Sequence, residues 1–218
     1  MPPPPQPADP LAVPPADGSA DLAMLVQALI TSRHSVAPKR LQAPGPSTAQ
    51  LLQMVEAATC APDHRGLRPW RLIRIADTQR DALAALFEAC ALDRDPACHA
   101  DDRARSRDKA YRAPALLLAV LRSTPDDPEV PLTERAVTLG AALMNLLLCA
   151  HGKGYAAMLT SGRAVRSARF AAAMALAGDE QAVCFVSIGS ARRAQRHARA
   201  DAADLLSDWQ ASAGLGGT

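Results

Sequence analysis

The stretch TERAVTLGAALMNLLLCAHGKG, residues 133–154, is the longest apolar segment of the chain. Its apolar residues lie on nearly every side of a helix, which is typical of a helix in the middle of a structure. Gly152 and Gly154 should end the helix, because glycine readily adopts the left-handed conformation that follows many helix C-termini. We therefore expect a central helix around which the other elements pack.

Short apolar runs on both sides of this helix have the length of β-strands. Runs of this kind, bounded by turn residues, indicate buried strands. The expected strands are RLIRI (71–75), APALLLAVLR (113–122), YAAMLTSG (155–162) and AVCFVSIGS (182–190).

Helical periodicity fills most of the remaining chain, and capping residues mark several helix starts. Asp21 is expected to cap the first helix, and Ser47 with Gln50 fits a capping box. Thr78 and Asp81 form a second such pair. The helices are expected at 21–30, 47–59, 77–92 and 164–178, with a charged, exposed helix or lid within 93–112. Helices alternating with strands predict an α+β or three-layer arrangement around a central sheet.

The composition indicates one domain with appendages. The chain has 218 residues, 49% of them hydrophobic and 3% aromatic, which favours helices over a β-sandwich. Residues 1–20 are rich in proline and are expected to be a disordered tail. The folded domain is expected at 21–195, and 196–218 is interpreted as a C-terminal extension whose apolar residues could dock on another surface.

Several classes of protein are disfavoured. The net charge of +2, with mixed signs throughout, gives no electrostatic footprint for nucleic acid. The five cysteines form no C-x-x-C pair, so we expect no metal site, and their odd number favours a reducing compartment. No uninterrupted apolar stretch is long enough to span a bilayer, and the N-terminus has no signal-peptide pattern. We therefore expect a cytoplasmic protein that does not bind membranes.

The segment CAPDHRGLRPWRLIRI, residues 60–75, contains residues that a simple connection between a helix and a strand does not need. Pro62 and Pro69 stiffen a loop between a helix and a strand, so His64 should be held in a defined direction. Asp63 either fixes the histidine ring or caps the loop through backbone N–H groups. Trp70 is expected to pack between the loop and the sheet.

Four motifs in order resemble the flavin-dependent nitroreductase family, in particular its compact bacterial branch of NAD(P)H nitroreductases. They are SRHSVAPKRL (32–41), APDHRGLRPWRLI (61–73), ERAVTLGAALMNLLLCAHGKGY (134–155) and MLTSG (158–162). The second motif is the most specific, and together they cover most of the chain from Asp21 to Arg193.

The resemblance implies a nitroreductase-like three-layer α+β fold, with a central, mostly antiparallel sheet flanked by helices. It also implies an intertwined homodimer with FMN at each of two subunit interfaces. NAD(P)H would bind transiently and pass a hydride through FMN to a nitroaromatic, a quinone or a similar small-molecule acceptor. The chain shows no separate G-x-G-x-x-G segment for the nicotinamide cofactor, which agrees with transient binding.

The same resemblance assigns the flavin-binding residues, and no side chain is expected to act as a catalytic nucleophile. A guanidinium and a hydroxyl suit the phosphate, and a histidine N–H suits a flavin oxygen or ring nitrogen. Two further basic pairs, Lys39 or Arg40 and Arg192 or Arg193, stay open as phosphate ligands. The expected FMN ligands are Arg33, His34, Ser35, Cys60, His64, Leu159, Thr160 and Ser161.

Two alternatives remain open at the level of the sequence. Arg33 and Ser35 could simply form a solvated basic helix end, which the helix dipole favours in any case. The scaffold could also serve as a non-catalytic or regulatory flavin-binding protein. Neither the physiological acceptor nor the choice between NADH and NADPH follows from the residues.

Overall fold

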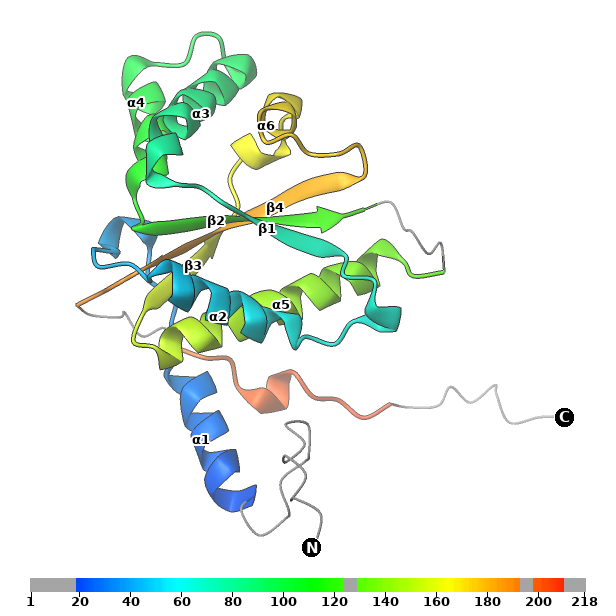
Figure 1. The fold of residues 1–218 in the computed structure, drawn as a ribbon. Helices are drawn as coiled ribbons and strands as arrows, with labels where there is room; N and C mark the ends of the chain where they lie inside the picture. The colour runs from blue at the N-terminus through cyan, green and yellow to red at the C-terminus, as the bar shows by residue number, and fades with distance from the viewer. Residues whose placement is uncertain (1–18, 124–128, 193–197, 210–218) are drawn as a thin grey trace, which may run out of the picture.

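The computed structural model describes residues 19–123, 129–192 and 198–209. A four-stranded sheet separates two layers of helices (Figure 1). The strands are β1 (Trp70–Arg74), β2 (Ala115–Arg122), β3 (Ala156–Thr160) and β4 (Glu180–Gly189). The helices are α1 (Ser19–Ser32), α2 (Thr48–Thr59), α3 (Arg80–Arg94), α4 (Ala100–Asp108), α5 (Leu132–Gly152) and α6 (Ala168–Ala173). The expected Pro-rich tail falls almost wholly on residues 1–18, which lie outside the described residues.

The sheet has the strand order β1-β2-β4-β3, and each neighbouring pair is antiparallel. β2 and β4 form its centre, with Leu117 opposite Val186 in the register. Beyond β3, an isolated parallel bridge joins Ser35 to Ala157, so the segment after α1 continues the sheet at that edge. All four expected strands are therefore present, within a few residues of their expected limits.

The two faces of β2 serve two separate cores, because successive side chains of a strand point to opposite sides. Leu117, Ala119 and Leu121 pack with α2 and α5, where Met54 and Leu146 are fully buried. The alternate residues of β2, Leu116, Leu118 and Val120, pack toward α3 and α6. This explains why β2 appears in the sequence as a continuous apolar run.

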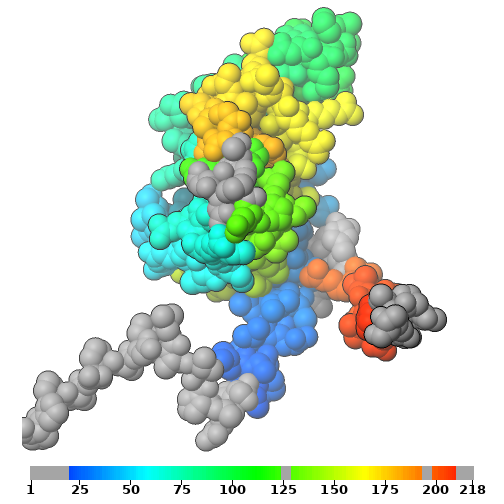
Figure 2. Space-filling model, turned by 90° about the vertical axis from the view of Figure 1, so that its right-hand side faces the viewer, coloured from blue at the N-terminus to red at the C-terminus, as the bar shows by residue number. Residues whose placement is uncertain are grey.

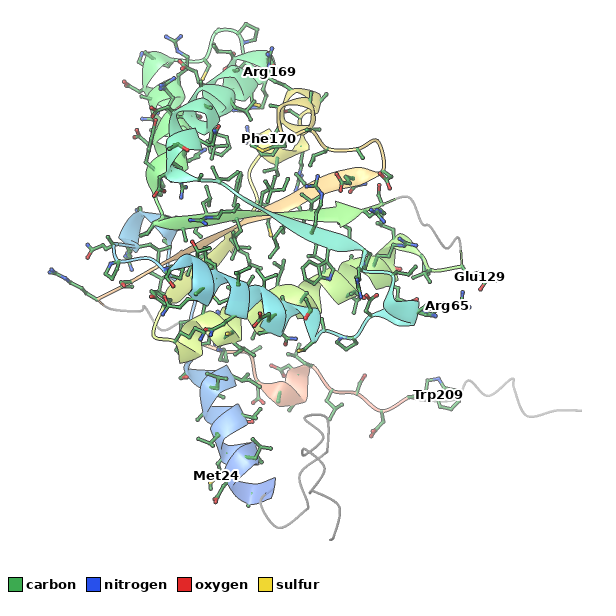
Figure 3. The ribbon with its side chains drawn as sticks, in the orientation of Figure 1. Met24, Arg65, Glu129, Arg169, Phe170 and Trp209 are labelled. Atoms are coloured by element: carbon green, nitrogen blue, oxygen red, sulfur yellow. The ribbon has the colours of Figure 1, made fainter. Side chains whose placement is uncertain are left out.

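All three phenylalanines of the chain meet in the second core. Phe87 of α3, Phe170 of α6 and Phe185 of β4 lie with ring centroids 5.7–6.3 Å apart. Phe170 is completely buried and stacks on Phe87, while Phe185 meets both rings edge-on. These rings hold α3 and α6 to the same face of the sheet. Figure 3 shows Phe170 on that side of the sheet.

The helix starts agree only partly with the sequence. The capping box of α2 is present, since Ser47 and Gln50 exchange side-chain to backbone hydrogen bonds. The expected roles of Asp21 and of the Thr78–Asp81 pair are wrong. α1 begins at Ser19 and places Asp21 in its first turn, and α3 begins at Arg80, after a short 3₁₀ helix at Asp77–Gln79, with no side-chain cap. Before α3, a 3₁₀ turn thus takes the place of the expected cap.

α5 is long and apolar enough to cross a membrane by length and composition alone. In this fold it packs instead against α2, β2 and β3, and one side of it forms much of the first core. As expected, α5 ends at Gly152, and Gly154, just beyond it, has a φ of +83°. The segment 164–178, in contrast, is less helical than expected, because α6 spans only six residues.

α1 and residues 198–209 project from the three-layered body (Figures 1 and 2). α1 contacts mainly α5, and it exposes Leu22, Met24, Leu25, Val26 and Ile30. At the other end, Leu205 and Leu206 are strongly exposed, and Trp209 is 81% exposed. Met24 and Trp209 both extend away from the body (Figure 3).

A bidentate ion pair joins β1 to β4 across β2, the strand that lies between them. The guanidinium of Arg71 in β1 donates to both carboxylate oxygens of Glu180 in β4, at 2.6 and 2.7 Å. These hydrogen bonds lower the pKa of Glu180 to about 2, against the opposing effect of burial. The backbone N–H of Ala177 donates to the same carboxylate and lowers the pKa further.

Glu180→Gln should therefore change how stability depends on pH. A carboxylate whose pKa is lowered in the folded state stabilises fully above its ordinary value, 4.5, and loses this contribution as the pH falls toward about 2. We expect the variant to lose about 1–3 kcal/mol at neutral pH and to show a flatter acid limb. Urea unfolding at several pH values measures both effects, and Glu56→Gln, on the exposed side of α2, is the control. An unchanged acid limb would contradict the assignment.

Candidate functional site

The segment after α1 runs beside β3 and brings the first expected ligands to that edge. The Val36 N–H donates to the Ala157 carbonyl at 3.2 Å, next to the bridge between Ser35 and Ala157. At the end of α1, Ser32 Oγ lies 2.8 Å from Nε2 of His151, in the last turn of α5. Arg33, His34 and Ser35 are thus fixed where α1, α5 and β3 meet.

Arg33 occupies an unusual environment for a guanidinium. Its Nε is buried and has no hydrogen-bond partner in the described part of the chain. Arg199 donates to the Arg33 carbonyl at 2.7 Å, so a second cation lies nearby. Burial lowers the pKa of Arg33, and the charge of Arg199 lowers it further. A buried donor next to a like charge is costly unless an anion joins it, so these residues suit a phosphate.

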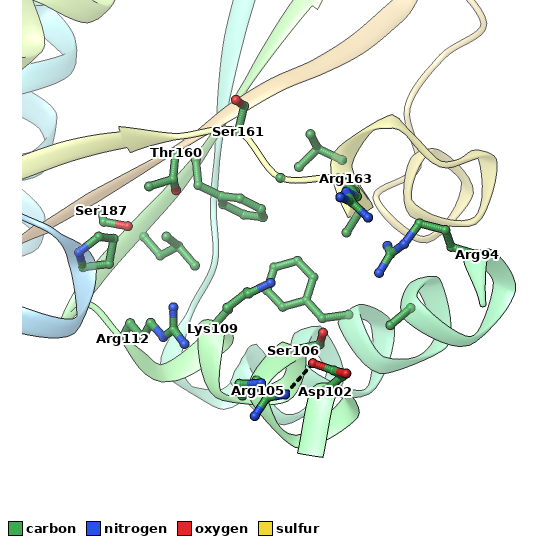
Figure 4. Close-up of a pocket in the computed structure, with 18 of the residues that line it drawn as sticks. Arg94, Asp102, Arg105, Ser106, Lys109, Arg112, Thr160, Ser161, Arg163 and Ser187 are labelled. Atoms are coloured by element: carbon green, nitrogen blue, oxygen red, sulfur yellow. Dashed lines mark hydrogen bonds and ion pairs between the residues drawn. The ribbon is translucent and has the colours of Figure 1, made fainter. Parts of the chain in front are cut away.

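A pocket of about 870 Å³ opens on the α3 side of the sheet. Its apolar wall includes Phe87 and Phe185, and the buried Ser187 contributes a hydroxyl. Thr160 and Ser161 line it at the end of β3 (Figure 4). Pro38 lines it from the segment that carries Arg33. The pocket therefore combines an apolar surface with polar groups, as sites for planar cofactors do.

Leu159 does not belong to this pocket wall. Its side chain packs against the first core, on the α5 side of the sheet, whereas Thr160, the next residue, lines the pocket. The alternation of side chains along a strand accounts for the difference. Within this chain, then, Thr160 and Ser161 face the pocket and Leu159 supports the strand behind it.

Five basic side chains line the same pocket, and the sequence interpretation did not select any of them. They are Arg94, Arg105, Lys109, Arg112 and Arg163. The first four come from the end of α3 and from the charged segment 93–112, which folds as α4 and a 3₁₀ turn, in agreement with the expected exposed helix. The excess of arginine in DDRARSRDKAYR (101–112) was the signal that could have indicated them.

His64 lies in a 3₁₀ turn at the other end of the molecule, where Nδ1 is 2.5 Å from a carboxylate oxygen of Glu134, at the start of α5. The suggestion that Asp63 fixes the histidine ring is thus wrong. Asp63 caps the loop, since it accepts a hydrogen bond from the Arg68 N–H at 2.7 Å. Trp70 packs against the first core, as expected.

Cys60 follows α2 and is exposed, unlike the buried Cys90 and Cys184. Burial raises the pKa of Cys184 to about 11, so that thiol is a poor nucleophile. In the described ranges, no three His, Cys, Asp or Glu side chains are placed to hold a metal ion.

The eight expected ligands thus fall into two separate groups. Glu134 contacts His64 in one group, and His151 contacts Ser32, next to Arg33, in the other. These two residues are 17 positions apart along α5, or about 25 Å at the rise of an α-helix. β1, next to the His64 loop, and β3, next to Ser35, are also opposite edges of the sheet. One chain therefore does not bring His64 and Cys60 to the pocket that Thr160 and Ser161 line.

Of the open phosphate ligands, Lys39 and Arg40 lie in an exposed 3₁₀ turn at Pro38–Arg40. Arg192 is exposed just after β4, and Arg193 lies outside the described residues. Arg199, from the C-terminal segment, is the cation whose contact with the Arg33 backbone is observed.

Comparison with known families gives a match over most of the chain. The model described as "Nitroreductase family" matches residues 30–190. The "Putative NAD(P)H nitroreductase" of Haemophilus influenzae is 29% identical over 172 residues, which cover 78% of this chain and 91% of the relative.

Solved structures show the same fold. The nitroreductase-like family protein from Bacillus cereus superposes with a TM-score of 0.72 at 19% identity, over 85% of this chain and 96% of the other. The FMN-dependent nitroreductase NfnB from Mycobacterium smegmatis, solved in complex with NADPH, gives a TM-score of 0.69 at 15% identity, over 87% of this chain and 100% of the other.

The loop geometry predicts that Asp63 stabilises the fold. In Asp63→Ala, the N–H of Arg68, a residue with a φ of +48°, loses its acceptor. We expect the free energy of unfolding to fall by about 1–3 kcal/mol, because the bond is charge-assisted. Asp63→Asn keeps an acceptor oxygen and should recover most of the loss. Urea unfolding compares the three proteins, and equal stability of the alanine variant would rule out the capping role.

Proposed function

Because the chain belongs to the nitroreductase family, we propose that it is an FMN-dependent oxidoreductase that transfers a hydride equivalent from NAD(P)H to a small-molecule acceptor, such as a nitroaromatic or a quinone. The observation that carries the proposal is the buried Arg33 Nε without a partner in the described residues, on the segment that flanks β3. This donor and the pocket lined by Thr160 and Ser161 suit the two ends of FMN, a dianionic phosphate and a flat ring.

The residues of this chain would bind and orient the cofactor. Arg33 would donate to phosphate oxygens, with the Ser35 hydroxyl as a further donor. Thr160 and Ser161 would offer hydrogen bonds to the ring edge, beside the apolar wall of Phe87 and Phe185. When bound, FMN supplies the ability to accept a hydride and pass it on. The protein contributes position, hydrogen bonds and restricted access for water.

We further propose that the functional unit is a homodimer in which each site combines residues of both copies. The separation of His64 and Cys60 from the Arg33 segment supports this arrangement, because a second copy can bring its His64 to the first copy's pocket. Exposed apolar residues on α1, together with Leu205, Leu206 and Trp209, offer surface for a second copy to cover. An obligate interface of this kind would bury more than about 2,000 Å².

The visible spectrum of the purified protein tests the function directly. We expect about one FMN per chain, with a flavin absorption that bleaches when NADPH is added without oxygen and returns when a quinone or nitroaromatic is supplied. Colourless protein that takes up no FMN on titration would contradict the proposal. A bound flavin that neither NADH nor NADPH reduces would favour a non-catalytic flavin-binding protein.

Arg33→Ala should weaken FMN binding by about tenfold to hundredfold, the range expected for one charge-assisted hydrogen bond. Riboflavin, which lacks the phosphate, should bind the variant and the wild type alike. Arg169→Ala, which removes an exposed arginine paired with Asp93 on the opposite layer, is the control. Equal losses for riboflavin and FMN would show that Arg33 has a structural role only.

Mixing two variants tests whether the site is shared between copies. Arg33→Ala and His64→Ala subunits, unfolded and refolded together, would form mixed dimers with one intact site and one doubly altered site. Random pairing in a two-fold dimer should restore about a quarter of all sites. Turnover is measured at an FMN concentration too low to load Arg33→Ala alone. Mixtures whose turnover does not exceed the share contributed by His64→Ala homodimers, measured separately, would place both residues in the same chain's site or outside it.

A further inference from the structure

The pocket beside β3 carries an unbalanced positive charge. Five basic side chains line it against two carboxylates, among the residues that the structure describes. One of these carboxylates, Asp102, is already paired with Arg105 at 2.6 Å. The other, Asp95, accepts a hydrogen bond from the Ala97 N–H and shapes the loop between α3 and α4. The remaining four cations, Arg94, Lys109, Arg112 and Arg163, are called the basic quartet below.

The basic quartet has no carboxylate of its own. Within the described ranges, none of its four members forms an ion pair or a side-chain hydrogen bond. Other arginines of the same layer are paired, such as Arg107 with Glu88 and Arg169 with Asp93. The difference between paired outer arginines and unpaired inner ones indicates that the pocket receives its counter-charge from a ligand.

All four side chains of the basic quartet line the same pocket. Arg94 of α3 and Arg163, which follows β3, are drawn on one side of the pocket, and Lys109 extends toward them from the other side (Figure 4). Although much of the Lys109 side chain is accessible, partial burial lowers its pKa, and the charges of Arg112, Arg94 and Arg163 lower it further. An anion placed among these groups would relieve that repulsion.

If Arg33 holds the FMN phosphate, the quartet is left for a different anion. We infer that the electron acceptor of this pocket is a small aromatic anion, whose ring lies on the apolar wall and whose carboxylate or other acidic group binds the basic quartet. Phe87 and Phe185 supply the aromatic wall. This inference rests on the proposed function, and it specifies the class of acceptor that the function leaves open.

4-Nitrobenzoate and its neutral isostere 4-nitrobenzamide are suitable probes. In the first two-electron step, the nitro group becomes a nitroso group, NAD(P)H gives one hydride and becomes NAD(P)⁺, one proton comes from the solvent, and one water molecule leaves. The carboxylate or carboxamide takes no part in the bond changes. A difference between the two probes therefore reports recognition of the charge.

The decisive experiment compares kcat/KM for both probes in wild type, Arg163→Gln and Arg107→Gln. We expect the wild type to prefer 4-nitrobenzoate by about tenfold or more, with the preference shrinking at high salt. Arg163→Gln should lose most of that preference, because its kcat/KM for 4-nitrobenzoate should fall about tenfold or more relative to its kcat/KM for 4-nitrobenzamide. Arg107→Gln removes the same charge from the outer side of α4, where Arg107 pairs with Glu88, and should keep the preference.

A binding measurement supports the kinetics without turnover. Benzoate, which cannot be reduced at a nitro group, is titrated into the FMN-loaded protein while the visible flavin spectrum is followed. We expect its dissociation constant to rise about tenfold or more in Arg163→Gln and to stay the same in Arg107→Gln. Equal binding to all three proteins would overturn the inference.

The remaining outcomes separate this inference from the function beneath it. If FMN-loaded wild type reduces both probes equally, the inference of an anionic acceptor is wrong, but the proposed oxidoreductase function stands. If the protein binds no FMN, the proposed function is itself wrong. If Arg163→Gln weakens FMN but not riboflavin, the quartet is the phosphate site and the inference is wrong. If the variant loses only a preference for NADPH over NADH, the quartet serves the dinucleotide, and the inference is again wrong.

Discussion

The burial of β2 and β4 on both faces is the constraint on which the rest of this structure depends. Two strands at the centre of a sheet must be covered from both sides, so the chain has to supply two helical layers. α2 and α5 cover one side, and α3 and α6 cover the other. Because α5 crosses one whole face, it fixes how far apart the segments at its two ends can lie.

That separation shapes the chemistry of the molecule. The end of α5 holds the Arg33 segment next to β3, while its start holds His64 through Glu134. The sheet then places the cationic pocket on the face away from α5. Within one chain, the residues that the sequence suggested as ligands thus lie in two separate groups, one at each end of α5.

The sequence predicted the elements that depend on local patterns. The four apolar runs became strands, and Ser47 with Gln50 formed its capping box, because both signals act within a few residues. Asp21 and Thr78 did not cap helices, since a favourable residue type does not decide where a backbone turn begins. The fold family followed from the order of four motifs, and the match over residues 30–190 confirms it.

The candidate site was harder to predict from the sequence, because contacts between segments far apart in the chain set its geometry. Glu134 lies 70 residues from His64, and Arg199 lies 166 residues from Arg33. Leu159 and Thr160 are neighbours that face opposite sides of the sheet, a detail that depends on strand register. The two tryptophans have a practical consequence of their own. Trp70 is packed against the core and Trp209 is exposed, so their fluorescence divides into a shielded, blue-shifted component and a red-shifted one open to soluble quenchers. The light that the protein emits therefore distinguishes the state of its interior from the state of its terminal segment.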